Sequence, residues 1–487
     1  MRLNGESLTG QGYALPLDRS SVEPGIVHLG LGAFARAHTA VYTERAMQAT
    51  GDHSWGIVGV TQRSDAVVQQ LAPQDCLFSV AERGEGAAPL HVVSSIVEAV
   101  SGRDQPGVVV QRIASPATSI ITLTITEKGY RMDPRTDSLN VADEQVQADL
   151  AGGPPRTAIG QIVRGLQERS RLGSGPITVV SCDNLPANGE LTQRLVRAFA
   201  AALPDAESAP LLAWMDGNVT FPNTMVDRMV PATAAGDLAA VEHELGLRDK
   251  AAVVAEPFMQ WVLEDNFAGP RPRWEDAGAL FTSDVAGWEA AKLRLLNASH
   301  SLLAYLGLAT GKTTIADAVA EDALRAACER MMFDDVLPTL QLPPGLDGET
   351  YCKQVLSRFA NPALGHTTAK VASDGSQKIG LRLLSTVHGN LDAGRSPKWA
   401  ALAVAAWMRF VAVTPVEELN DPLAADLHAA LPSLRTASEV VPALLGVRSV
   451  FDAELAAHSG FASLLEHWYS VIDHHGLEGL GNEILHG

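Results

Sequence analysis

The sequence predicts an α/β fold for residues 1–286, with a doubly wound, parallel sheet, followed by a mainly α-helical part over residues 287–487. In the first part, short runs rich in Val, Ile and Leu alternate with helical patterns, as expected of parallel strands joined by crossover helices. In the second part, helical patterns are separated by breaks rich in Pro and Gly, with no convincing strand after Leu280. A chain of 487 residues also exceeds what one hydrophobic core usually supports, which favours two domains.

The N-terminal part is expected to contain six strands and at least two crossover helices. Its apolar runs are continuous rather than alternating, which is typical of strands covered on both faces. The expected strands are residues 25–31, 55–60, 77–81, 90–97, 119–126 and 177–182, and the expected helices are residues 34–50 and 158–171.

The C-terminal part shows helical periodicity in six segments. The expected helices are residues 289–308, 316–332, 349–358, 398–413, 421–430 and 438–445.

Composition and charge exclude several classes of protein. The formal net charge of -19 argues against a nucleic-acid partner, because phosphate binding requires clustered Lys and Arg. The four cysteines are far apart, so neither a disulfide framework nor a cysteine-based zinc site is expected. The first residues lack the apolar core of a signal peptide, and no apolar stretch is long enough to span a membrane. We therefore expect a cytoplasmic protein without a membrane partner. These observations leave its oligomeric state open between a monomer and a small homo-oligomer.

A glycine-rich loop follows the first expected strand. Residues 30–35 read Gly-Leu-Gly-Ala-Phe-Ala, a G-x-G-x-x-A pattern between a strand and a helix. Gly30 permits the tight turn, Gly32 lets the backbone approach a pyrophosphate, and Ala35 allows close helix packing. Ala33 and Phe34 open a helix whose free N–H groups favour phosphate. The pattern predicts a Rossmann-type, dinucleotide-binding domain; the alternative is a glycine-rich turn that binds nothing.

The choice between NAD and NADP depends on the residues after the second strand. The usual acidic residue is replaced by Thr61 and Gln62, and Asp65 comes only later, at the start of the next helix. Asp65 could accept hydrogen bonds from the adenosine ribose hydroxyls, which favours NAD. Arg63 and Ser64 could instead accommodate a 2′-phosphate, so NADP remains the less favoured alternative.

The segment AKLRLLNASHSLLA carries a lysine, an asparagine and a histidine in a K-x4-N-x2-H pattern. At about 100° per residue, Asn297 lies roughly 140° and His300 roughly 80° from Lys292 around an α-helix, so all three are expected on one side of it. Asp183 and Asn184 follow a strand of the α/β part, at the edge where such sheets bind ligands. A lysine with a depressed pKa can exchange a proton with an alcohol, and amide N–H groups can hold the developing alkoxide. The alternative is an amphipathic helix with a solvated lysine.

Several long motifs resemble the mannitol dehydrogenase family, the long-chain polyol-specific dehydrogenases, over nearly the whole chain. They occur in the family's order and are IVHLGLGAFARAH (from Ile26), LTITEKGY (ending at Tyr130), SCDNLPANG (from Ser181), FPNTMVDRMVP (from Phe221), EPFMQWVLEDNF (from Glu256), KLRLLNASHSLLAYLG (from Lys292) and SDGSQK (from Ser373).

The resemblance implies catalysis without a metal, with Lys292 as general acid/base. It also implies that Asn184 and Asn297 form the oxyanion hole and that His300 orients the substrate. Two acids are candidates for the proton path to the lysine. Glu289 lies one helical turn before Lys292, and Glu127 follows a strand in TEKGY; either could instead be a solvated charge.

Three further residues match positions near the substrate in that family. Asp227 and Arg228 lie in MVDR, and their alternative role is an ion pair between domains. Lys370 could pair with a sugar carboxylate or donate to a hydroxyl, or it could be a surface lysine.

Within the family, details such as VAERG, TIAD and RFANP look most like fructuronate reductases, also called D-mannonate oxidoreductases. Residues 365–370 depart from that branch, which is richer there in Arg and aromatic residues. The expected function is NAD-dependent interconversion of D-fructuronate and D-mannonate, with reduction using NADH. The alternatives are a mannitol 2-dehydrogenase or D-arabinitol 4-dehydrogenase, a non-catalytic NAD-binding sensor, and a phosphosugar dehydrogenase.

Overall fold

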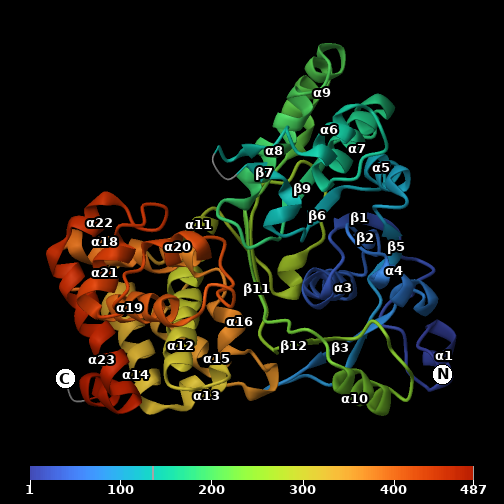
Figure 1. Ribbon diagram of the computed structural model, residues 1–487. Coiled ribbons are helices and arrows are strands. Elements are labelled where there is room, and N and C mark those ends of the chain that lie inside the picture. Colours follow the sequence, from blue (N-terminus) through green and yellow to red (C-terminus); the bar gives the residue numbers. More distant parts are fainter. Residues whose placement is uncertain (134–135, 486–487) are drawn as a thin grey trace. The chain divides into compact units, whose positions relative to one another are not determined.

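The computed structural model describes residues 1–133 and 136–485, which divide into two compact units (Figure 1). The N-terminal unit is Met1–Val285 and the C-terminal unit is Ala286–Gly487. The strands named below all lie in the N-terminal unit, whereas the C-terminal unit is built from helices.

The main sheet of the N-terminal unit has six strands in the order β10-β9-β6-β1-β2-β5, and every neighbouring pair is parallel. Its chain order reverses on the two sides of β1, which is the topological switch point where such sheets bind ligands. The doubly wound fold is thus confirmed. The strands are β1 (Pro24–Leu29), β2 (Gly56–Thr61), β5 (Ile96–Ser101), β6 (Ile120–Leu123), β9 (Ile177–Ser181) and β10 (Val219–Thr220).

Both faces of this sheet are covered, which explains the continuous apolar runs. Successive residues of a strand point to opposite faces, so Val27 packs into one core cluster and Ile26 into another. The first cluster contains residues of α5 (Pro106–Ala114), α7 (Ala158–Leu172) and α8 (Asn188–Ala201), and the second contains residues of α3 (Thr39–Thr50).

One expected strand lies outside the main sheet, and another lies only partly within it. The segment 77–81 forms β3 (Phe78–Glu82), which pairs with β4 (His91–Val93) and β12 (Val253–Ala255) in a separate sheet. The expected strand 90–97 was wrong as one element, because it is divided between β4 and β5. At the division, the backbone N–H and the hydroxyl of Ser94 donate to the buried carboxylate of Glu44 instead of to a neighbouring strand.

The third sheet is made of β11 (Thr224–Asp227), β13 (Gln260–Glu264) and β14 (Leu280–Thr282). The expected helix 34–50 is also divided, into α2 (Ala33–Ala37) and α3. The chain leaves helical geometry at His38, whose φ is -124° and ψ is -82°. There the imidazole Nε2 hydrogen-bonds the Gln260 carbonyl at 2.9 Å, which ties the break to β13.

The C-terminal unit packs around α19 (Lys398–Val413), whose bounds match the expected helix. Nearly all of α19 is buried, and it contacts α12 (Ala298–Ala309) and α23 (Ser459–Leu485). The expected helices 349–358, 421–430 and 438–445 correspond to α15 (Gly348–Phe359), α20 (Ala424–Ala430) and α21 (Ala437–Leu445). The expected helix 316–332 is interrupted at Glu321, which is extended and separates α13 (Ile315–Ala320) from α14 (Asp322–Arg330).

Between residues 286 and 485, three segments are π-helical: Lys292–Asn297, Met331–Val336 and Gly380–Leu384. The first lies between α11 (Val285–Ala291) and α12, so the expected helix 289–308 is continuous but contains a widened turn. In the part of the chain that the structure describes, every helix falls short of the length and apolar character that a membrane span requires.

Candidate active site

The glycine loop after β1 has the shape that a dinucleotide needs. Gly30 has a φ of +101°, and a Cβ there would lie 2.2 Å from the Thr124 carbonyl oxygen. The backbone N–H groups of Gly30 and Leu31 both donate to the Val60 carbonyl, at 2.8 and 2.9 Å. These bonds hold the loop at the end of β2, and the hydroxyl of Thr124, which follows β6, donates to the Gly30 carbonyl at 2.8 Å.

Gly32 differs from Gly30, because its backbone faces open space. Its φ is -112°, and a Cβ there would find only the Gly30 carbonyl oxygen, at 3.7 Å. This open backbone fits a closely approaching pyrophosphate. The helix that begins at Ala33 is only five residues long, so the loop's own N–H groups would carry most of the contact.

Asp183 organises the carboxyl end of β6. Its buried carboxylate accepts hydrogen bonds from the backbone N–H groups of Ile125 and Thr126, at 3.0 and 2.8 Å, and from the Tyr130 hydroxyl at 2.9 Å. Burial raises the pKa of this carboxyl. The clamp holds the turn Glu127–Tyr130, which begins after Thr126, a residue with a positive φ of +61°.

Two predicted catalytic residues flank this clamp. Asn184 follows Asp183 directly and is exposed, and Glu127 is exposed on the clamped turn. The sequence predicted a catalytic role for Asn184, but it did not predict that Asp183 positions the neighbouring turn. An acid at the end of a strand, next to a polar side chain, was the available signal.

Asp65 lies at the start of α4 (Ala66–Leu71), as predicted. Its carboxylate accepts a hydrogen bond from the Gln69 amide at 2.6 Å. Its role toward the ribose stays a prediction.

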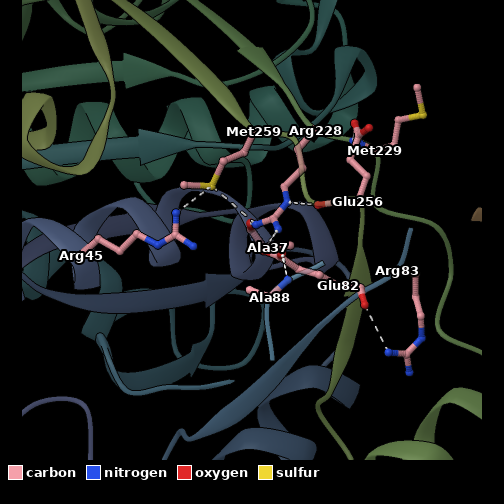
Figure 2. Close-up of polar contacts among 9 residues, drawn as sticks. All are labelled: Ala37, Arg45, Glu82, Arg83, Ala88, Arg228, Met229, Glu256 and Met259. Carbon is pink, nitrogen blue, oxygen red and sulfur yellow. Dashed lines mark hydrogen bonds and ion pairs between the residues drawn. The ribbon is translucent and has the colours of Figure 1, made fainter. Parts of the chain in front are cut away.

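Asp227 and Arg228 lie at the end of β11, and both are buried within the N-terminal unit. The Arg228 guanidinium pairs with Glu82 at 2.7 Å and donates from Nε to the Glu256 carbonyl at 3.0 Å (Figure 2). It also donates to the Ala37 carbonyl. These contacts favour a structural role within one unit, and the predicted substrate contact of both residues stays a prediction.

The lysine helix of the C-terminal unit has an unexpected geometry. Lys292 is buried and begins the π-helical segment that ends at Asn297. A π-helix bonds residues five apart, so Asn297 comes one turn after Lys292 on the same side, rather than about 140° away. The widened turn therefore brings Lys292 and Asn297 onto the same side of the helix. Short π segments of this kind are frequent at functional sites.

His300 follows on α12, and its ring contacts two other rings. It stacks on Phe359, with ring centroids 5.0 Å apart, and on His366 at 5.8 Å. Its Nε2 is buried and has no hydrogen-bond partner among residues 1–133 and 136–485. Leaving such an atom unpaired costs free energy, which is typical of a group that meets a ligand or a water molecule.

Positive charge gathers around His300. Burial lowers the pKa of this imidazole well below its usual value, and His366, Arg382, Lys378 and Arg358 lower it further. The ring is therefore neutral and can accept as well as donate a hydrogen bond.

Lys378 and Arg382 are the cations that sequence reasoning missed. Lys378 donates to the carbonyls of Val371 and Ser373, at 3.2 and 2.5 Å, and burial lowers its pKa to about 8. Arg382 donates to the Asn297 carbonyl at 3.1 Å and to the Ser301 hydroxyl at 2.9 Å. The available signal was their spacing, because residues four apart share one helical face.

The remaining predicted residues lie on neighbouring elements of the C-terminal unit. Glu289 is half-buried on α11, three residues before Lys292. Lys370 is exposed on α16 (Thr368–Ala372), and its charge lowers the pKa of His366. In the described ranges, no group of three or more His, Cys, Asp or Glu side chains is arranged to hold a metal ion.

Two family models together match most of the chain. The mannitol dehydrogenase Rossmann domain matches residues 24–276, and the mannitol dehydrogenase C-terminal domain matches residues 284–473. The chain belongs to the mannitol dehydrogenase family. The family resemblance that the sequence motifs indicated is confirmed, as is a Rossmann-type domain followed by a helical one.

Relatives in this family cover almost the full length of the chain. D-Mannonate oxidoreductase of Escherichia coli is 39% identical over 464 residues, which is 93% of this chain and 94% of the relative. A mannitol dehydrogenase of Saccharomyces cerevisiae is 36% identical over 479 residues, covering 96% and 94%. Mannitol 2-dehydrogenase of Pseudomonas fluorescens, solved with NAD and D-mannitol, superposes with a TM-score of 0.85 at 34% identity, covering 100% of both chains.

This mannitol dehydrogenase family member is therefore an oxidoreductase that acts on alcohol groups of polyols or sugar acids, as the sequence predicted. The site residues divide between the two units. The N-terminal unit carries the dinucleotide loop, and the C-terminal unit carries Lys292, Asn297 and His300.

Proposed function

We propose that the enzyme interconverts an open-chain keto sugar acid and its aldonate, D-fructuronate and D-mannonate, with a nicotinamide dinucleotide. The choice of a sugar acid as substrate rests on the group of cations around His300, which includes Lys378 and Arg382. The similarity to a D-mannonate oxidoreductase supports the same substrate.

The cations favour an anionic substrate over a neutral polyol. In the described part of the chain, all hydrogen bonds of Lys378 and Arg382 go to neutral oxygens, so their charges are not neutralised by a carboxylate within hydrogen-bond distance. The chain as a whole carries a net charge of -19, so this local excess of positive charge is not a general property of its surface. Asp374 and Asp421 act on Lys378 electrostatically but form no ion pair with it among the described residues. A substrate carboxylate would accept the charge-assisted hydrogen bonds that these two acids do not.

The chain's own residues then divide the work of proton transfer and orientation. A dinucleotide held at the loop of Gly30 and Gly32 would supply the chemistry of hydride transfer at the reacting carbon. Lys292 takes the hydroxyl proton in oxidation and returns it in reduction. The side-chain amide of Asn297, which makes no hydrogen bond in the described part of the chain, donates to the substrate oxygen as negative charge develops there. The neutral His300 orients a neighbouring hydroxyl.

Three residues enter this proposal from the family resemblance. Asn184 would be a second amide donor to the substrate oxygen, and Glu289 and Glu127 would relay protons to or from Lys292. The proposed active form needs no metal.

A substrate panel tests the choice of substrate. We expect kcat/KM for D-fructuronate to exceed that for D-fructose by roughly 10- to 100-fold, because a charged hydrogen bond contributes about 1.5–3 kcal/mol. Oxidation of D-mannonate, mannitol and arabinitol is followed by nicotinamide absorbance in the reverse direction. Lys378→Met should remove most of the preference for the acid, whereas Arg248→Ala, at an exposed site paired with Glu242, should leave it intact. A preference for fructose and mannitol would instead establish a polyol dehydrogenase.

The Lys292→Ala variant tests the catalytic assignment. We expect turnover to fall by at least about 10²-fold, since general acid/base groups contribute typically 10²–10⁴-fold. NADH binding, measured by fluorescence titration, should remain because the lysine belongs to the C-terminal unit and the dinucleotide loop to the other. Near-wild-type turnover would contradict the assignment, and a wild-type chain that binds NADH but turns over none of the panel would be a sensor.

A further inference from the structure

A small cavity of about 270 Å³ lies in the N-terminal unit and is strongly basic. It is formed at the carboxyl edge of the main sheet by residues that follow β2, β5 and β6 and by the start of α7. Its lining includes five cationic side chains: Arg63, Arg103, Lys128, Arg131 and Arg156.

Two of these cations are already neutralised. Arg103 pairs with Asp104 at 2.9 Å. Arg131 pairs with Asp143 at 3.1 Å and donates to the Gln145 side chain at 2.6 Å.

The other three cations have no such partner. Among residues 1–133 and 136–485, the side chains of Arg63, Lys128 and Arg156 form no hydrogen bond or ion pair. They surround one concavity in a chain that carries an excess of acidic residues. Like charges held together repel one another, so the arrangement favours a bound anion.

The backbone around the cavity is held firmly. The buried carboxylate of Asp149 accepts from the backbone N–H groups of Arg156 and Thr157, at 2.8 and 2.9 Å, which fixes the start of α7. Gln62 donates to the Gln161 side chain at 2.9 Å, which fixes the residue before Arg63. The cations therefore emerge from ordered positions rather than from a free loop.

The position of the cavity identifies the anion. In a doubly wound sheet, the residues that follow the second strand contact the adenosine ribose: an acid there binds the 2′-hydroxyl, and an arginine accommodates a 2′-phosphate. Arg63 occupies this position and lines the cavity, whereas Asp65 bonds to Gln69 and is not part of the lining.

We propose that this cavity binds the 2′-phosphate of NADP(H), so that the enzyme binds NADPH at least as tightly as NADH. The inference rests on the dinucleotide part of the proposed function and is independent of the sugar substrate. It reverses the preference for NAD that the sequence indicated through Asp65.

Binding to the full chain without sugar tests the proposal directly. Titration calorimetry with NADPH and NADH should give a Kd for NADPH no larger than that for NADH. Arg63→Ala should raise the Kd for NADPH roughly 10- to 100-fold, because it removes about one charged hydrogen bond to the 2′-phosphate. The Kd for NADH should change little. Lys128→Gln is the second variant, with the same expected direction. The matched control, Arg248→Ala, removes an exposed arginine paired with Glu242 and should change neither Kd.

Weaker binding of NADPH than of NADH to the wild-type chain would overturn the proposal. Competition with 2′,5′-ADP, 5′-AMP and ATP separates a 2′-phosphate site from a general phosphate site. We expect 2′,5′-ADP to compete best, and equal competition by ATP would overturn the assignment to the cofactor. A chain that binds NADPH tightly but turns over no sugar acid would refute the proposed substrate and leave this inference standing.

Discussion

At the scale of single residues, two glycines in one loop have different physical tasks. Gly30 is required by the fold, because its φ of +101° and the nearby Thr124 carbonyl exclude a side chain. Gly32 has a φ of -112° that other residues adopt readily, and open space where a Cβ would lie. The fold alone does not require a glycine at position 32, which suggests that a ligand does.

This contrast predicts opposite outcomes for two alanine variants. Gly30→Ala should destabilise the N-terminal unit by about 1–3 kcal/mol or more, from backbone strain and the clash with the Thr124 carbonyl. Gly32→Ala should change the free energy of unfolding by less than about 1 kcal/mol but raise the Kd for the dinucleotide by roughly tenfold or more. Urea denaturation and NADPH titration measure the two quantities. Wild-type affinity in Gly32→Ala would show that the loop does not contact the pyrophosphate.

The catalytic candidates show the limits of reasoning from single residues. Lys292, Asn297 and His300 were predicted because they occur within nine consecutive positions of one motif. Lys378 and Arg382 were missed because they lie about eighty positions further along the chain, and only folding brings Arg382 to the Asn297 carbonyl. Asp183 was missed as a positioning group because its partners follow a different strand.

At the scale of elements, the π-helical segment Lys292–Asn297 is the decisive departure from the prediction. Apolar periodicity predicted a helix over this range but could not distinguish five-residue from four-residue bonding. Widening a turn leaves backbone groups without their usual partners. Here the Asn297 carbonyl accepts from Arg382, which itself lies in the π-helical segment Gly380–Leu384. A hydrogen bond thus joins the two irregular segments.

Helix α3 provides a prediction of how stability depends on pH. Its Glu44 carboxylate is buried and accepts from the Ser94 N–H and hydroxyl, at 2.5 and 2.9 Å. Burial raises its pKa from 4.5 to about 7, against the smaller opposing effect of these hydrogen bonds. The folded state therefore favours the protonated acid, and the contribution to stability is fully present below pH 4.5 and lost as the pH rises through 7.

We expect Glu44→Gln to reduce this pH dependence, because the amide keeps the shape of the acid but does not ionise. The difference in pKa corresponds to about 3 kcal/mol, so the free energy of unfolding should fall less between pH 5 and pH 8 in the variant than in the wild-type chain. Urea denaturation at the two pH values measures the free energy of unfolding of the N-terminal unit. Equal pH dependence in both proteins would show that Glu44 is ionised in the folded state.

At the scale of the whole molecule, charge is distributed unevenly. The chain carries a net charge of -19. Each unit nevertheless contains a group of cations that have no carboxylate partner within hydrogen-bond distance among the described residues: Arg63, Lys128 and Arg156 in one, Lys378 and Arg382 in the other. An acidic protein repels anions over long distances, so anionic ligands need such local cations to bind. Both a phosphorylated dinucleotide and a sugar acid are anionic ligands of this kind.

By itself, the sequence determined the fold class, the family and the motif that holds Lys292, Asn297 and His300. These features are local or periodic: apolar runs define strands and helices, and a glycine pattern defines a turn. Only the tertiary structure decided which strands share a sheet, where a helix widens, and which distant cations surround His300 or the cavity at Arg63. Those features depend on contacts between residues far apart in the chain, and short-range patterns carry no information about such contacts.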